Sequence, residues 1–225
     1  MARTPRTPGT PGTPGAARTR AEEGGGAGLD TYRRKRRFDR SDEPSGAGGP
    51  AEAGGRPVFV VQVHDARRMH FDFRLEADGV LKSWAVPKGP SPDPHVKRLA
   101  APTEDHPMDY RFFEGVIAKG EYGGGTVMVW DEGTFRNMTR NRAGEEVPLG
   151  RALEQGHASF WLEGRKLRGG YALTRLPGQE AWLLVKKVDA HAKTERDADP
   201  RRLRSARTGR TLRGIAADDG SEGGA

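Results

Sequence analysis

The chain has 225 residues, of which 34% are hydrophobic, and it contains 32 glycines and 16 prolines, so it has apolar material for only one modest core. The absence of cysteine excludes disulfides, thiolate nucleophiles, iron–sulfur clusters and thiolate zinc sites, so any metal must be held by histidine and carboxylate ligands. The net charge of +7 is compatible with nucleic-acid contacts, but charge alone fits solvated tails equally well.

The composition divides the chain into four segments. Residues 1–31 are rich in Thr, Pro and Gly and are expected to be disordered, because they cannot bury enough apolar surface to offset their backbone entropy. Residues 32–55 form a basic arm, which contains the run Arg33 to Arg37, followed by a flexible linker. We expect one folded domain over 56–188 and a mobile or lightly docked tail over 189–225.

The folded segment reads as a series of short strands. Residues 58–64 and 70–76 have β-branched or alternating patterns, and the turn dipeptide Asp78-Gly79 leads into a further strand over 81–86. More strands are predicted over 112–118, 126–130, 133–136, 158–163, 166–175 and 181–187, with brief helical turns over 94–99 and 149–155. This pattern predicts an all-β fold, and we favour a small closed antiparallel β-barrel over a sandwich.

A metal site is predicted where two of these strands meet. His70, Asp72 and Arg74 lie on one face of the strand over 70–76, because side chains alternate along a strand. His64 ends the preceding strand and is expected to return opposite His70. Two imidazoles and one carboxylate suit Mn, Fe, Co, Ni or Zn. The alternative, in which these side chains only cover a solvent-facing strand, is about equally compatible with the residues alone.

Cationic groups near this triad indicate a phosphate substrate. Lys88 ends the next predicted strand, and Lys97-Arg98 and the polar stretch over 103–110 follow. A divalent ion beside Arg and Lys suits phosphoester hydrolysis, because the ion polarises a phosphoryl group and acidifies water. The tryptophans are interpreted as barrel packing, and the three glycines over 123–125 as a turn without a chemical role.

Ordered motifs resemble a known family, the 3′-phosphoesterase domain of bacterial DNA ligase D. The motifs are VVQVHDARRMHFDFRLE over 60–76, LKSWAVPKGP over 81–90, EDHPMDY over 104–110, FEGVI over 113–117, GEYGGG over 120–125 and WLLVKK over 182–187. The resemblance covers residues 32–188. It implies a manganese-dependent enzyme, with Co²⁺ or another divalent transition ion as the alternative, which removes a ribonucleoside and then a phosphate from 3′ ends of primer–template DNA during non-homologous end joining.

The resemblance also implies roles for individual residues. The metal ligands fall on His64, His70 and Asp72, and a further active-site position falls on His106. As our own mechanistic expectation, a protonated His106 donates a proton to the departing ribose oxygen. The other active-site positions fall on Gln62, Arg74, Lys88, Arg98 and Tyr110. Arg36 and Glu43 match less firmly, because Arg37 stands where the family has Asp; this change would weaken ribonucleoside removal unless a nearby acid such as Asp39 substitutes.

The resemblance further implies a stand-alone version of a domain that is often fused to polymerase and ligase domains. Its partners would then be DNA 3′ ends and a separate ligase, polymerase or Ku-type end-binding protein. No apolar run could cross a bilayer and residues 1–15 lack a secretory signal, so we expect a cytoplasmic, nucleoid-associated protein without a membrane partner. Two alternatives stay open: a non-catalytic nucleic-acid-binding barrel, and a metallophosphoesterase that acts on other phosphate esters.

Overall fold

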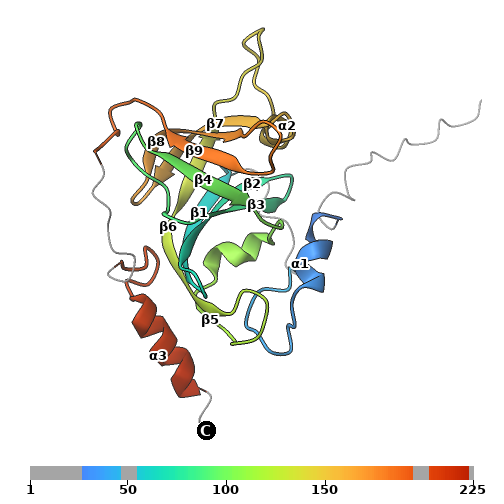
Figure 1. Cartoon of the computed structure of the whole chain (residues 1–225), viewed down its shortest axis with the longest axis vertical. Coiled ribbons are helices and arrows are strands. Elements are labelled where there is room, and N and C mark those ends of the chain that lie inside the picture. The colour runs from blue at the N-terminus through green and yellow to red at the C-terminus, as the bar shows by residue number, and fades with distance from the viewer. Residues whose placement is uncertain (1–26, 47–54, 195–202, 223–225) are drawn as a thin grey trace, which may run out of the picture.

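The computed structural model describes residues 27–46, 55–194 and 203–222 (Figure 1). The predicted disorder of residues 1–26 and the flexible linker over 47–54 lie outside the described residues. Residues 27–31, expected in the N-terminal tail, form η1 (Ala27–Leu29) and the start of α1 (Asp30–Arg34). The boundary moves because Leu29 and Tyr32 are buried against the folded domain.

Nine strands form the main sheet of the described chain, and every neighbouring pair is antiparallel. They are β1 (Val58–Asp65), β2 (His70–Ala77), β3 (Val80–Val86), β4 (Lys97–Pro102), β5 (Gly115–Ile117), β6 (Gly125–Asn137), β7 (His157–Gly164), β8 (Arg168–Arg175) and β9 (Trp182–Lys186). The strand order β1-β2-β3-β4-β9-β8-β7-β6 closes by pairing β6 with β1, and β5 adds to the outside of this ring on β6. The predicted closed antiparallel barrel is therefore confirmed.

Short helical elements complete the described chain: η2 (Met108–Phe112), α2 (Leu149–Glu154) and α3 (Leu212–Glu222). The helical turn predicted over 149–155 is confirmed by α2. The helical turn predicted over 94–99 is wrong, because residues 97–102 form β4, in which Arg98 and Ala100 alternate with exposed neighbours. The predicted strand over 112–118 is shorter, since η2 takes its beginning, and the two strands predicted over 126–136 are one continuous β6.

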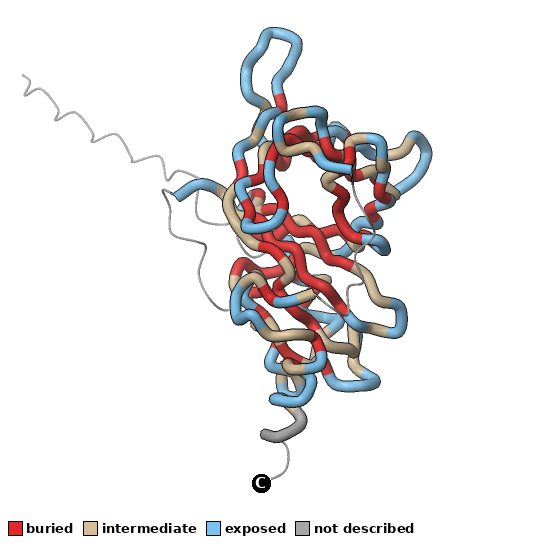
Figure 2. The backbone as a smooth tube through the Cα atoms, turned by 90° about the vertical axis from the view of Figure 1, so that its left-hand side faces the viewer, coloured by how far each residue is buried: buried red, intermediate tan, exposed pale blue. Residues whose placement is uncertain are grey.

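Two apolar clusters lie on opposite faces of β1. Phe59, Val61 and Val63 point into the barrel and belong to its main core, whereas Val60 belongs to a second cluster on the outer face. The second cluster also contains Tyr32, Leu81, Met108, Tyr110, Phe113, Ile117, Val127 and Val129. The strands are buried along most of their length (Figure 2) because the N-terminal arm, η2 and β5 cover this outer face. Side chains alternate along β1 and β2, so successive residues lie in the barrel core and on the covered outer face. Both of these environments are buried.

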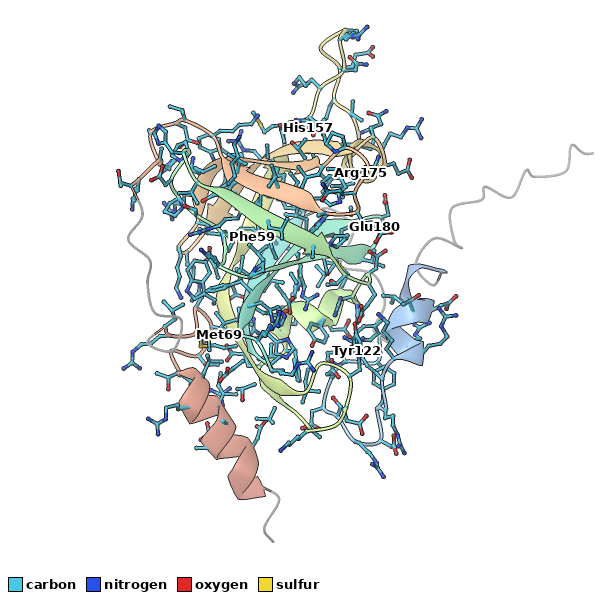
Figure 3. The ribbon with its side chains drawn as sticks, viewed as in Figure 1. Phe59, Met69, Tyr122, His157, Arg175 and Glu180 are labelled. Atoms are coloured by element: carbon cyan, nitrogen blue, oxygen red, sulfur yellow. The ribbon has the colours of Figure 1, made fainter. Side chains whose placement is uncertain are left out.

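The tryptophans divide between these environments. Trp84 and Trp182 pack in the barrel core, as expected from the sequence, and Trp130 packs against its edge. Trp161 is only partly buried on the outer face of β7, where Arg136 and His191 flank its ring. Figure 3 shows the barrel end with His157, Arg175 and Glu180 far from Tyr122, which lies near α1. Within the described residues, no helix has the length and apolar character needed to span a bilayer.

Candidate metal centre and its polar network

The β1–β2 hairpin brings the predicted ligands together. His64 and His70 are direct register partners, and their ring centroids lie 4.9 Å apart. Asp72 lies 3.7 Å from Nδ1 of His64 and 3.5 Å from Nε2 of His70. One ligand atom from each of the three residues lies within 4.8 Å of the others. A first-row divalent ion with bonds of about 2.0–2.2 Å places its ligand atoms roughly 3–4 Å apart, so this donor set can hold one ion.

Backbone carbonyls orient both imidazoles for this purpose. Nε2 of His64 donates to the carbonyl of Gly123 at 2.7 Å, and Nδ1 of His70 donates to the carbonyl of Arg68 at 2.9 Å. A carbonyl only accepts, so these bonds place the proton on the nitrogen that points away from Asp72. The nitrogens nearest Asp72 are then the ones that can bind a metal, which displaces any proton that they share with Asp72 in the metal-free chain. The glycine turn over 123–125, predicted to have no chemical role, thus supplies one of the two orienting carbonyls.

Asp72 is held ionised in this site. Burial alone would raise the pKa of Asp72, but the Arg74 guanidinium and hydrogen bonds from His64 and His70 keep that pKa well below its usual range. Burial likewise opposes protonation of His70, yet its contact with Asp72 raises the pKa of His70 overall. A carboxylate with two neutral imidazoles leaves coordination positions open for a substrate oxygen and water.

Arg74 links the triad to the rest of the site. Its side chain is almost fully buried; NH2 donates to Asp72 at 3.0 Å and Nε donates to Oε1 of Gln62 at 2.8 Å. NH1 donates to Oγ of Ser83 at 2.9 Å. Gln62 in turn donates to the carbonyls of Tyr110 and Phe113. A guanidinium has five N–H donors, and these three acceptors leave donors for a phosphate oxygen.

His106 lies between two guanidinium groups. Its Nδ1 lies 2.8 Å from the carbonyl of Glu104 and 2.9 Å from NH1 of Arg74, and its Nε2 lies 3.1 Å from NH2 of Arg36. Arginine only donates and a carbonyl only accepts, so the neutral form that accepts from Arg36 at Nε2 and donates from Nδ1 to Glu104 satisfies two of these three contacts, and Arg74 then lies beside Nδ1 without a hydrogen bond to it. Burial, followed by Arg74 and Arg36, holds the pKa of His106 well below its usual range. The protonated His106 expected from the sequence does not fit these surroundings.

This arrangement predicts that the His106 ring stays neutral at pH 6.5, where an ordinary histidine is about half protonated. Long-range ¹H–¹⁵N NMR of the metal-free chain would measure both the charge and the tautomer of the ring. We expect one pyrrole-type nitrogen, assigned to Nδ1. A ring that carries protons on both nitrogens at this pH would contradict the assignment.

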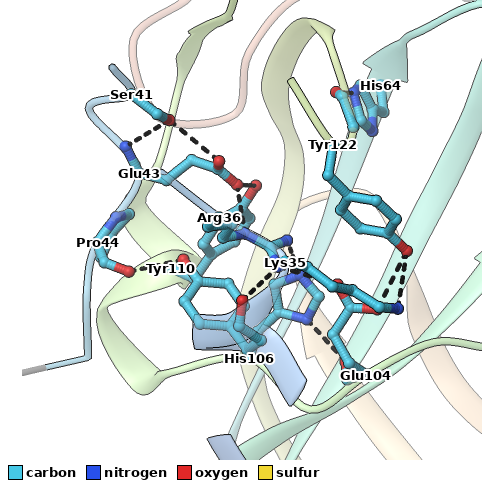
Figure 4. A network of polar contacts seen from close by, with 12 residues as sticks. Lys35, Arg36, Ser41, Glu43, Pro44, His64, Glu104, His106, Tyr110 and Tyr122 are labelled. Carbon is cyan, nitrogen blue, oxygen red and sulfur yellow. Dashed lines mark hydrogen bonds and ion pairs between the residues drawn. The ribbon is translucent and has the colours of Figure 1, made fainter. Parts of the chain in front are cut away.

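The N-terminal arm closes over His106 (Figure 4). Arg36 donates to Glu43 and to Glu104, both at 2.9 Å, and stacks 3.8 Å from the centroid of Tyr32. The Tyr110 hydroxyl also donates to Glu43 at 3.0 Å. Both less firmly predicted residues, Arg36 and Glu43, are thus placed in the same network as His106 and Tyr110.

Arg37, the residue that departs from the family pattern, lies outside the buried network. Its side chain is 56% exposed and lies 3.8 Å from Asp39, which is also exposed. Neither side chain takes part in the contacts of Arg36 with Glu43 and Glu104. Asp39 therefore does not occupy a substitute position within this buried network.

The structure does not bring Lys88 and Arg98 into the network. Lys88 is exposed in the turn after β3 and forms no hydrogen bond or ion pair with the residues that the structure describes. Arg98 is buried on β4, at a position that pairs with Leu184 and shares a face with Ala100, and both neighbours belong to the barrel core. Arg98 therefore belongs to the interior of the barrel, whereas the triad lies on its outer face.

Sequence reasoning missed three contributors to the site. Glu104 binds Arg36 and, at 3.1 Å, Lys35, whereas Ser83 accepts from Arg74. Ser83 could have been identified as a partner of Arg74, because the two residues lie opposite each other in the β2–β3 register. Gly123 acts through its carbonyl, which no side-chain pattern reveals.

Comparisons with known proteins show what the chain is similar to in sequence. Residues 62–175 match the model of the DNA Ligase D 3′-phosphoesterase domain. A multifunctional non-homologous end joining protein LigD from Pseudomonas aeruginosa is 50% identical over 169 residues, which are 74% of this chain and 19% of that protein. The DNA repair protein LigD of Mycobacterium tuberculosis is 43% identical over 155 residues, 69% of this chain and 19% of that protein. The chain thus spans about a fifth of the length of these relatives.

Proposed function

Because the chain belongs to the DNA ligase D 3′-phosphoesterase family, we propose that it is a metal-dependent phosphoesterase that trims DNA 3′ ends during non-homologous end joining. Its substrates in this proposal are primer–template ends that carry a 3′-ribonucleotide or a 3′-phosphate. The supporting observation is the pair of imidazoles, each oriented by a backbone carbonyl, that turn their other ring nitrogens toward a buried carboxylate.

His64, His70 and Asp72 would hold the ion, for which we propose Mn²⁺, with Co²⁺ as the alternative. Such an ion would polarise a phosphoryl oxygen and lower the pKa of a bound water. Arg74 would bind another phosphoryl oxygen through its remaining donors and neutralise charge that develops on phosphorus. Gln62 and Ser83 fix the plane of this guanidinium, so that it need not reorganise.

In this proposal the protonation of His106 depends on substrate binding. Its pKa is low partly because of the charges on Arg74 and Arg36. A phosphate bound against Arg74 would offset part of that charge and raise the pKa of His106. Protonation would then follow substrate binding, and His106 could donate to the departing ribose oxygen. Tyr110 would hold Glu43 and thereby Arg36 in place.

We propose a cytoplasmic, nucleoid-associated location and functional partners drawn from ligase, polymerase or Ku-type end-binding proteins. This part follows from the relatives, which are non-homologous end joining proteins. For Lys88 and Arg98 we propose supporting roles outside the metal centre. Arg98 would stabilise the barrel interior, and Lys88 would contact the phosphate backbone of bound DNA from the exposed turn after β3.

The experiment combines a choice of ends with a choice of ions. The chain is incubated with primer–templates that end in a 3′-phosphate, a 3′-ribonucleotide or a 5′-phosphate, before and after chelation and after addition of Mn²⁺, Co²⁺, Zn²⁺ or Mg²⁺. We expect release of the 3′-phosphate and the 3′-ribonucleoside, loss on chelation and recovery with Mn²⁺. Undiminished turnover after exhaustive chelation would refute the metal mechanism. DNA binding without turnover under every ion would instead favour the non-catalytic barrel.

A further inference from the structure

The C-terminal segment over 203–222 lies beyond the region that matches the family model. The sequence predicts a mobile or lightly docked tail there, without a helix. In the structure this segment turns back onto the barrel, and α3 contacts β5 and β6 (Figure 1). Leu212 and Ile215 are buried, with 4% and 0% of their surface exposed. Two buried apolar side chains thus hold this charge-rich segment against the barrel.

Polar contacts from the segment converge on Glu114, the residue before β5. The Thr208 hydroxyl donates to Oε2 of Glu114 at 2.7 Å, and Arg210 lies 3.4 Å from the same oxygen. The other oxygen of Glu114 accepts from the backbone of Val129 on β6 at 2.9 Å. The backbone of Ala206 also donates to the carbonyl of Val129. Glu114 therefore joins the C-terminal segment to both strands of the β5–β6 hairpin.

Asp219 on α3 holds the outer edge of β5. Its carboxylate accepts from the backbone N–H of Val116, the central residue of this three-residue strand. Gly115 eases this approach, because a Cβ there would make a tight contact of 3.3 Å with the Asp219 carboxylate. An edge strand of three residues has few ladder bonds of its own, so this external acceptor contributes much of its fixation.

The same hairpin carries the carbonyl that orients His64. Between β5 and β6 the chain turns over 118–124, and Gly123 at the end of this turn accepts from Nε2 of His64. Gly125 begins β6 so close to β1 that a Cβ would lie 2.4 Å from the carbonyl oxygen of Asp65. The β5–β6 hairpin can therefore pack against β1 in only one position. A displacement of β5 would shift the Gly123 carbonyl with it.

We propose that the C-terminal segment is a positioning element for the metal centre: Asp219, with Thr208 and Arg210, fixes the β5–β6 hairpin so that Gly123 holds His64 in its metal-binding orientation. This inference rests on the proposed metal centre. It assigns these residues no contact with substrate or ion, and their effect passes through Glu114, Val116 and Gly123.

The test measures Mn²⁺ affinity of the full chain directly, from the electron paramagnetic resonance signal of free Mn²⁺ during titration. Asp219→Ala is expected to weaken binding roughly tenfold, at the low end of the range for outer-shell partners of a metal ligand. Asp219→Asn should restore affinity close to that of the unaltered chain, because the amide oxygen still accepts from Val116 N–H. Arg210→Ala removes one of the partners of Glu114 and should weaken binding in the same direction.

The control is Leu149→Ala in α2, which removes buried apolar surface without touching the β5–β6 hairpin. It should lower the unfolding midpoint while it leaves Mn²⁺ affinity unchanged, and circular dichroism would confirm that every variant is folded at the titration temperature. If Asp219→Ala does not fold, Arg210→Ala takes its place. If the folded Asp219→Ala variant, or Arg210→Ala in its place, binds Mn²⁺ with unaltered affinity, this inference is wrong and the metal centre is unaffected. Failure of the unaltered chain to bind Mn²⁺ would overturn the metal centre, and this inference with it.

Discussion

Replacement of Asp72 by asparagine is expected to abolish stable binding of the divalent ion and to lower phosphoesterase turnover by about 10³-fold or more. Asp72 is the one carboxylate of the triad and lies 3.7 and 3.5 Å from the two imidazoles. An amide oxygen is a neutral and weaker ligand, and its substitution leaves Arg74 without its ionic partner. A bound ion contributes several kcal/mol of transition-state stabilisation, and each 1.36 kcal/mol corresponds to a factor of ten in rate.

The measurement pairs Mn²⁺ titration with steady-state release of phosphate from a 3′-phosphate primer–template. Asp65→Asn is the matched control, because Asp65 is an exposed carboxylate one residue from His64 at the end of β1. That variant should bind Mn²⁺ and turn over like the unaltered chain. If Asp72→Asn retained turnover within a factor of three of the control, the triad would not be the catalytic metal site.

Strand alternation made the triad predictable from sequence. His70, Asp72 and Arg74 share one face of β2 by parity, and the short loop from His64 allows a direct hairpin return. The alternative that the same argument left open was a solvent-facing polar strand, whereas Asp72 and Arg74 are buried. The difference arises because segments distant in sequence, the N-terminal arm and η2, cover the outer face. Their own periodicity does not encode where they pack.

Other parts of the site depended on contacts that sequence patterns do not contain. The helical turn over 94–99 is replaced by a strand because β4 pairs with β9, a long-range partner that overrides local preference. Arg98 matched the family in type, but its placement inside the barrel follows only from that pairing. The docking of α3 was missed because, over the part of this helix whose burial is described (212–219), only Leu212 and Ile215 are buried.

From the contacts of Arg74 we expect this one residue to affect both stability and chemistry. β1 and β2 have the barrel core on one face and, on the other, a layer of buried polar side chains beside the second apolar cluster. Within this layer, Arg74 balances the charge of Asp72 and satisfies the oxygens of Gln62 and Ser83. The layer therefore holds a buried ion pair together with the hydrogen bonds that make burial tolerable.

Arg74→Ala is accordingly expected to destabilise the metal-free chain by about 3–5 kcal/mol, the range for loss of one partner from a buried ion pair. The variant leaves the Asp72 carboxylate buried without its cation, and Gln62 and Ser83 lose a donor. Added Mn²⁺ should recover part of this loss, because the ion would supply the missing positive charge beside Asp72. Turnover should stay low even with Mn²⁺, because the phosphoryl group loses its guanidinium partner.

Urea unfolding with and without Mn²⁺ measures the first two effects, and phosphate release from the 3′-phosphate end measures the third. Arg67→Ala, at an exposed arginine in the β1–β2 loop, is the matched control and should change stability by no more than about 0.5 kcal/mol. Arg74→Lys separates charge from geometry: an ammonium group keeps the charge beside Asp72 but cannot donate to Asp72, Gln62 and Ser83 in one plane. We therefore expect Arg74→Lys to recover much of the stability and little of the turnover. A lysine variant with full turnover would show that Arg74 acts only as a counter-charge, and the proposed alignment of the phosphoryl group by its planar donors would be wrong.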